Sequence, residues 1–147
     1  MKNAPVRAPH VLLIDDNRDG LLVRRTLLEE AGYRVSPAAS GEQGLKLYAS
    51  SAFDLVVTDF RMPGGIDGVE VIRQIRTSDP NARVVLISKV VEPLGLNEEN
   101  TGADAVIAKS ATEASNLLRA VKRLLNRPAR KPAGSQRVAR AGAAAVR

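Results

Sequence analysis

The chain has 147 residues, 44% of them hydrophobic, which is enough for one compact core and short for two. It contains no cysteine, which excludes a disulfide framework and any thiolate metal site. The formal net charge of +6 is concentrated at one end: residues 127–147 carry six basic residues and no acidic one, and the preceding residues carry 16 of each sign.

This charge distribution divides the chain into an N-terminal arm (1–9), a charge-balanced domain (10–126) and a basic tail (127–147). The tail lacks aromatic residues, leucine and isoleucine, so we expect it to be disordered. Its charge would suit nucleic acid or another acidic surface. The first apolar run, 11–14, is too short for a signal peptide or a membrane span, and we therefore predict a cytoplasmic protein.

The first half of the domain alternates short apolar runs with segments of helical periodicity. Residues 11–14 predict a buried strand, and residues 18–31 predict a helix that ends at Gly32. A second strand is expected over 34–38. The pattern Ser40-Gly41-Glu42-Gln43 is typical of a capping box and predicts a second helix that extends to about residue 49.

The second half continues in the same way. A strand over 53–59 and a loop over 60–66 precede a helix capped by Asp67 and Glu70, and a fourth strand is expected over 83–88. Residues 92–101 should form a helix, although Pro93 and Gly95 are poor interior residues. A strand over 105–108 and an amphipathic helix with a Leu/Val stripe over 117–125 follow. Successive βα units predict an α/β fold with a doubly wound parallel sheet.

Polar residues end the predicted strands: Asp15 and Asp16 the first, Asp59 the third, Ser88 the fourth and Lys109 the fifth. Each also has an ordinary interpretation as a helix cap, a turn residue or a surface charge. The carboxyl ends of parallel strands meet at one edge of a sheet, however, and three carboxylates there would repel one another without a cation. Mg²⁺ prefers such oxygen ligands. We expect Asp16 and Asp59 to bind it directly and Asp15 mainly through water.

These motifs resemble the receiver domain of two-component response regulators, over roughly residues 10–126: Leu-Leu-Ile-Asp-Asp, Val-Val-Thr-Asp-Phe-Arg-Met-Pro, Ile-Ser and then Lys109. The resemblance implies a five-stranded flavodoxin-like sheet in the order 2-1-3-4-5. It also implies that Asp59 accepts a phosphoryl group from the phosphohistidine of a sensor histidine kinase or phosphotransfer protein. The backbone carbonyl of Arg61 would complete the Mg²⁺ shell, Ser88 would be a switch hydroxyl, and Lys109 would neutralise phosphoryl charge.

Four features depart from the pattern of that family. The loop between Met62-Pro63 and Asp67-Gly68 has one extra residue. Val106 stands where receivers carry an aromatic residue, and Lys89 stands where they carry a small one. Ser110 replaces the proline that follows the lysine, so the cis peptide bond usual at that position is in question.

The leading hypothesis is a single-domain response regulator, a phosphoacceptor that promotes its own phosphorylation and then changes its affinity for an unknown downstream protein. The alternative is a phosphorylation-independent binding module whose basic tail contacts nucleic acid or an acidic partner. A dinucleotide-binding enzyme or hydrolase is disfavoured, because no Gly-rich loop follows the first strand and no serine elbow is present. Residues after 125 are too few and too polar for a helix-turn-helix domain.

Overall fold

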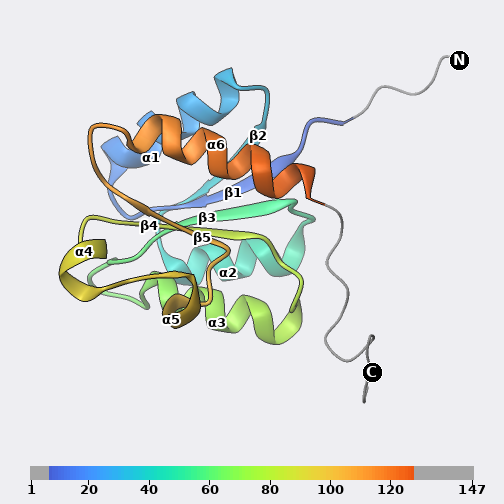
Figure 1. The fold of residues 1–147 in the computed structure, drawn as a ribbon. Coiled ribbons are helices and arrows are strands. Elements are labelled where there is room, and N and C mark those ends of the chain that lie inside the picture. The colour runs from blue at the N-terminus through green and yellow to red at the C-terminus, as the bar shows by residue number, and fades with distance from the viewer. Residues whose placement is uncertain (1–6, 128–147) are drawn as a thin grey trace, which may run out of the picture.

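The computed structural model describes residues 7–127, and within them five parallel strands form one sheet. Figure 1 shows the strands stacked across the middle of the molecule. The strands are β1 (His10–Ile14), β2 (Arg34–Ala38), β3 (Leu55–Asp59), β4 (Val84–Ser88) and β5 (Ala105–Ala108). Their order is β2-β1-β3-β4-β5, so the predicted parallel α/β fold and strand order are confirmed.

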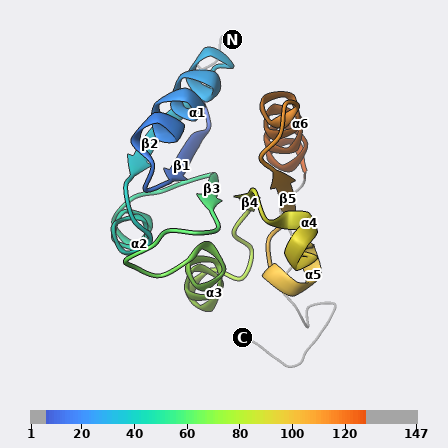
Figure 2. The same ribbon diagram turned by 90° about the vertical axis from the view of Figure 1, so that its left-hand side faces the viewer.

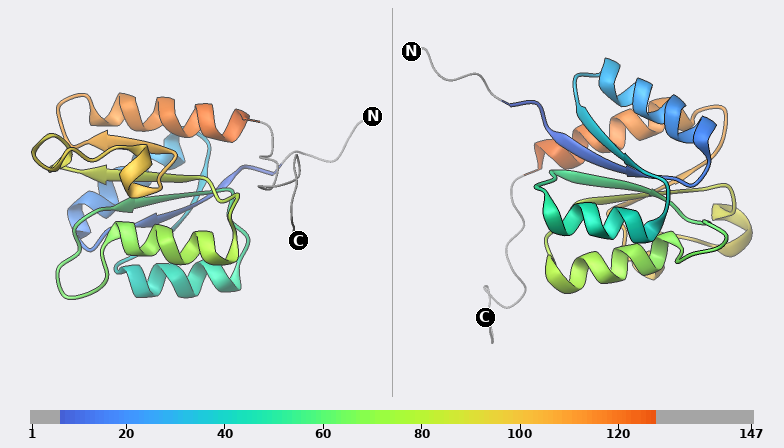
Figure 3. Two further views of the ribbon diagram at one scale, coloured as in Figure 1. Left: turned by 60° about the horizontal axis from the view of Figure 1, so that its bottom comes forward. Right: turned by 180° about the vertical axis from the view of Figure 1, so that it is seen from behind.

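Helices cover both faces of the sheet, as Figures 1 and 3 show. One face carries α1 (Arg18–Glu30) and α6 (Glu113–Asn126), and the other carries α2 (Gly41–Ser50) and α3 (Gly68–Ser78). Two short helices, α4 (Val91–Leu94) and α5 (Glu98–Thr101), lie beside edge strand β5 (Figure 2). Among residues 7–127, no helix is long and apolar enough to cross a membrane.

The core has two layers because successive strand residues point to opposite faces. In β1, Val11 and Leu13 pack with the α1 and α6 side, whereas Leu12 and Ile14 pack with the α2 and α3 side. Strands β3 and β4 alternate in the same way. All four apolar residues of β1 are at most 1% exposed, which explains why the run is continuously apolar rather than alternating.

Helix caps agree closely with the sequence. The Ser40 hydroxyl accepts from the Gln43 N–H, the Asp67 carboxylate accepts from the Glu70 N–H, and Gly32 has a positive φ of 101° after α1. One detail of the expected capping box differs. The Gln43 side chain accepts from the N–H of Ala39, one residue before the cap, at 2.7 Å.

The expected helix over 92–101 is wrong in extent, because two short helices replace it. Gly95 ends α4 with a φ of 62°, a left-handed conformation that a glycine adopts without strain. Asn97 then starts α5 by a reciprocal capping box with Asn100. A stop signal at Gly95 and a start signal at Asn97, two residues later, therefore interrupt the helix. The predicted tail lies outside the described residues except for Arg127, and only residues 7–9 of the predicted arm are described.

Candidate functional site

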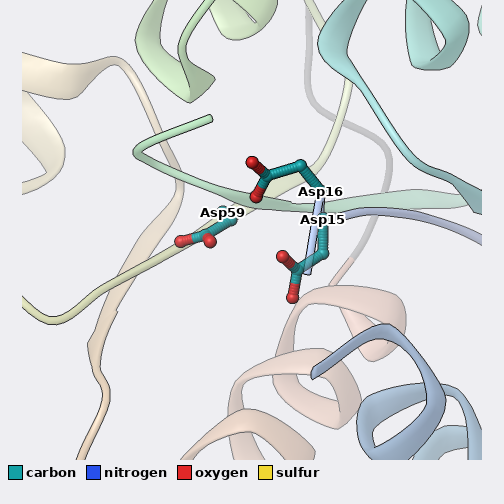
Figure 4. A group of neighbouring side chains, drawn as sticks. All are labelled: Asp15, Asp16 and Asp59. Atoms are coloured by element: carbon teal, nitrogen blue, oxygen red, sulfur yellow. The ribbon is translucent and has the colours of Figure 1, made fainter. Parts of the chain in front are cut away.

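The predicted acidic cluster forms where β1 and β3, neighbours in the sheet, end side by side. Asp15 and Asp16 follow β1 and Asp59 is the last residue of β3; each offers a carboxylate oxygen within 4.8 Å of the others. Figure 4 shows the Asp15 and Asp16 side chains diverging beside Asp59. Asp15 and Asp59 are buried and Asp16 is exposed, so solvent reaches the cluster from the Asp16 side.

Asp59 is held on both carboxylate oxygens. Its Oδ1 accepts from the Phe60 N–H at 2.9 Å, and its Oδ2 accepts from the Lys109 Nζ at 3.0 Å. The backbone N–H of Lys109 donates to the Ser88 carbonyl at 3.0 Å, which anchors the lysine next to β4. The structure therefore brings Lys109 and Asp59, fifty residues apart in the chain, into direct contact.

Both oxygens of Asp15 are also occupied by protein donors. Oδ1 accepts from the Asn17 N–H at 2.9 Å, and Oδ2 accepts from the Arg24 Nη1 at 2.5 Å. Burial raises the pKa of the Asp15 carboxyl above its ordinary value; the nearby charge of Asp59 adds to this effect, and the Asn17 N–H and Arg24 oppose it. By contrast, the Asp16 carboxylate accepts no hydrogen bond from any other residue within 7–127.

Ser88 and Arg61 flank the cluster. Ser88 is 2% exposed, and its Oγ accepts from the Val90 N–H at 3.0 Å rather than from any group of the acidic cluster. Arg61 is exposed, with its guanidinium carbon 5.6 Å from the centroid of the Phe60 ring. That the backbone carbonyl of Arg61 binds the metal stays a prediction. The peptide bond between Lys109 and Ser110 is trans, since residues 7–127 contain no cis bond.

A close approach of α3 to β3 fixes the end of β3 that carries Asp59. The Gly68 N–H donates to the Phe60 carbonyl at 2.7 Å, and a Cβ on Gly68 would lie 2.3 Å from the backbone oxygen of Asp59. A glycine is therefore required here for lack of space. This gives the glycine of the Asp67-Gly68 pair a packing role that the sequence alone did not show.

Sequence reasoning missed Arg24 and Glu113. The Arg24 side chain is 9% exposed and pairs with both Asp15 and Glu113, the first residue of α6. A signal existed: Arg24 stands three residues after Leu21 and four before Leu28, on the face of the helix that packs inward. A charged residue on that stripe indicates a buried partner.

The donor set fits Mg²⁺. The cluster supplies carboxylate oxygens and no nitrogen or sulfur ligand, and the exposed, unbonded Asp16 leaves room for the waters that Mg²⁺ retains. Asp16 and Asp59 are the residues that would hold the ion. Both oxygens of Asp15 are engaged, as are both oxygens of Asp59, so the assignment of Asp15 to a contact through water stays a prediction.

Comparison with known proteins identifies the family. The family model described as "Response regulator receiver domain" matches residues 11–122. The chain belongs to this receiver family. Among curated receiver-containing relatives, it is 38% identical over 104 residues to the transcriptional regulatory protein AfsQ1 of Streptomyces coelicolor, a match that covers 69% of this chain and 44% of that protein. It is 33% identical over 113 residues to the sensor histidine kinase GacS of Pseudomonas protegens, covering 73% of this chain and 12% of the kinase.

Solved receivers have the same fold. A response regulator receiver protein from Sinorhizobium medicae is 34% identical, with a TM-score of 0.72 over 81% of this chain and 95% of that chain. The response regulator TrrA of Thermotoga maritima, solved in complex with Mg²⁺-BeF, is 31% identical, with a TM-score of 0.71 over 79% of this chain and 98% of that one. This chain spans less than half the length of the curated relatives named above.

Proposed function

We propose that this receiver accepts a phosphoryl group on Asp59 from the phosphohistidine of a sensor histidine kinase or phosphotransfer protein and then changes its affinity for a protein partner. The observation that carries the proposal is the contact between Asp59 and Lys109 beside Asp15 and Asp16, at the edge where β1 and β3 end. Similarity to receivers in regulators and sensor kinases supports a place in a phosphorelay.

In the proposed reaction, a carboxylate oxygen of Asp59 attacks the phosphorus in line with the bond to the leaving imidazole nitrogen. The new bond is an acyl phosphate, the phosphorus–nitrogen bond breaks, and the imidazole keeps the electron pair and takes a proton. Lys109 already lies 3.0 Å from Oδ2, so its ammonium is placed to hydrogen-bond a phosphoryl oxygen. The Phe60 N–H fixes the carboxylate plane by binding Oδ1.

Mg²⁺, when bound, would neutralise charge on the phosphoryl oxygens as they approach the carboxylates. Asp16 and Asp59 would hold it with the Arg61 carbonyl, and Asp15 would bind one of its waters. Ser88 would turn its hydroxyl toward the new phosphate, and it stands at the neighbouring strand end to do so. The chain acts on its own side chain and, in this proposal, is a phosphoacceptor rather than an enzyme with a separate substrate.

The test is to incubate the full chain with acetyl phosphate, with and without Mg²⁺, and to measure the intact mass. We expect one phosphoryl adduct that needs Mg²⁺ and disappears in Asp59→Asn. The matched control is Asp19→Asn, an exposed aspartate of α1 outside the cluster, which should form the adduct as the wild type does. No Mg²⁺-dependent adduct on the wild type would refute phosphoacceptance and favour the phosphorylation-independent binding module.

Three expectations from the sequence stay predictions. These are the cytoplasmic location, action without an attached effector domain, and a contact between the basic tail and an acidic partner such as nucleic acid. The tail apart from Arg127 lies outside the described residues. Deletion of residues 128–147 should leave the adduct intact and, if the tail binds nucleic acid, should abolish a salt-sensitive gel shift.

A further inference from the structure

A buried arginine connects the acidic cluster to the start of α6. Arg24, on α1, donates from Nη1 to the Asp15 Oδ2 at 2.5 Å and from Nε to the Glu113 Oε2 at 2.7 Å, with a longer contact of 3.3 Å from Nη2 to Oε1. Its side chain is 9% exposed, that of Glu113 is 19% exposed and that of Asp15 is 1% exposed. One guanidinium thus joins two carboxylates from different segments of the chain.

This arrangement puts a fixed positive charge beside the place where a cation would bind. A buried arginine cannot lose its proton to escape the charge, and its position is set by two partners rather than one. It also occupies the one oxygen of Asp15 that Asn17 does not bind. Glu113 lies on the far side of the guanidinium and offsets part of its charge.

We propose that Arg24 is a positioning residue that sets the Mg²⁺ affinity of the pocket. It holds Asp15 away from direct coordination. Its own positive charge also partly neutralises the three carboxylates and so weakens their attraction for Mg²⁺. Glu113 limits this effect by sharing the guanidinium, so the start of α6 is electrostatically coupled to the metal pocket. The inference rests on the proposed Mg²⁺-dependent function and assigns residues that this function did not use.

The competing explanation is that Arg24 only stabilises the packing of α1 against α6. Under that explanation, replacing Arg24 lowers stability and loosens Asp15, but there is no reason for Mg²⁺ to bind more tightly. The counterion role predicts that replacing Arg24 and replacing Glu113 change the Mg²⁺ affinity in opposite directions. Arg24→Leu removes the positive charge and should lower the dissociation constant for Mg²⁺, whereas Glu113→Gln frees that charge and should raise it.

The expected size follows from the charges. A unit charge near a divalent ion, even with the screening of bulk water, changes the ion's affinity by about tenfold at contact-range separations. We therefore expect Arg24→Leu to bind Mg²⁺ about tenfold more tightly and Glu113→Gln to bind it roughly threefold more weakly, since Glu113 lies farther from the cluster. Arg24→Lys keeps the charge and should stay nearer to wild type than Arg24→Leu does.

The experiment is an NMR-monitored MgCl₂ titration of the ¹⁵N-labelled full chain, following the amides of Asp16 and Phe60. Arg25→Leu is the matched control: it removes the same charge from the next position of α1, where the side chain is 45% exposed and paired with Glu29. Its Mg²⁺ affinity should equal that of wild type. Thermal melts establish that each variant is folded, and Glu113→Gln, which keeps the arginine, tests the proposal even where Arg24→Leu fails to fold.

The outcomes separate this inference from the function on which it rests. Tighter binding in Arg24→Leu or weaker binding in Glu113→Gln, with Arg25→Leu unchanged, supports the counterion role. If wild type binds Mg²⁺ and forms the phosphoryl adduct, but the folded variants show equal affinity or changes of the reverse sign, this inference alone is overturned. If wild type shows neither Mg²⁺ shifts nor an adduct, the proposed function falls with it.

Discussion

Replacing Gly68 by alanine should lower the stability of the domain and displace Asp59, the proposed phosphoacceptor. The added Cβ would lie 2.3 Å from the Asp59 carbonyl oxygen and 2.8 Å from the Leu86 Cδ1, and real Cβ atoms essentially never come closer than 3.0 Å to such atoms. The start of α3 must therefore move by at least about 0.7 Å away from β3. Overpacking of this kind costs about 1–3 kcal/mol, more than the helix preference of alanine returns.

Gly65→Ala is the matched control, three residues before Gly68 in the loop that leads into α3. Its Cβ would meet only the carboxylate end of Glu42, at 2.8 Å, an exposed group that can move aside at the cost of a 3.2 Å hydrogen bond from the Ile66 N–H. We expect a change within about 0.5 kcal/mol, or a slight gain from the stiffer unfolded chain. Urea denaturation of both variants gives the two free energies of unfolding. Equal stabilities for Gly68→Ala and Gly65→Ala would refute the steric reasoning.

The remaining predictions concern chemistry and pH. Lys109→Gln should slow phosphorylation by acetyl phosphate about a hundredfold at saturating Mg²⁺, measured as the rate of mass gain, because it removes a charged donor to the phosphoryl oxygens. Lys89→Ala and Arg61→Asn should each shorten the half-life of the aspartyl phosphate by roughly twofold or more, because a long cation that reaches the phosphate would obstruct water; an unchanged decay would exclude this. Burial and the hydrogen bond to Asp79 raise the pKa of Tyr48. The folded state therefore holds this proton more tightly than the unfolded state, so its contribution to stability is complete below the unfolded pKa of about 10 and is lost as pH rises beyond it. Tyr48→Phe should lower the free energy of unfolding by about 1 kcal/mol at pH 7 and flatten its alkaline decline, as urea denaturation across pH can measure.

The acidic site was predictable because its residues end apolar strands. Asp16, Asp59 and Lys109 are far apart in the chain, but parallel strands order their carboxyl ends at one edge, and the structure brings them together there. The role of Arg24 was not predictable in this way. Its partners, Asp15 and Glu113, are set by how α1 and α6 pack on one face, and the sequence shows only that a charge interrupts an apolar stripe.

The secondary structure of residues 91–101 was also predictable only in part. Helical periodicity, Pro93 and Gly95 gave conflicting signals, and the outcome depended on local hydrogen bonds that periodicity does not include. The Asn97 and Asn100 side chains close a capping box on each other, and the Asn100 amide donates to the Gly95 carbonyl at 2.9 Å. These contacts and the left-handed Gly95 make two short helices self-consistent, while Pro93 lies in the first turn of α4, where its missing N–H is tolerated.

One departure from the family pattern, Val106, bears on the contact between Ser88 and the start of α4. Val106 is aliphatic, so it cannot report a movement of Ser88 by swinging an aromatic ring. The Ser88 Oγ instead accepts from the N–H of Val90, the N-cap residue of α4, whose own side chain makes no capping hydrogen bond. If the hydroxyl turned toward a phosphate on Asp59, that N–H would lose its partner, and α4 would keep only its own backbone bonds, such as that from the Leu94 N–H to the Val90 carbonyl at 3.1 Å. Ser88 as a switch hydroxyl stays a prediction, and a loosened start of α4 is the change that this contact would add to it.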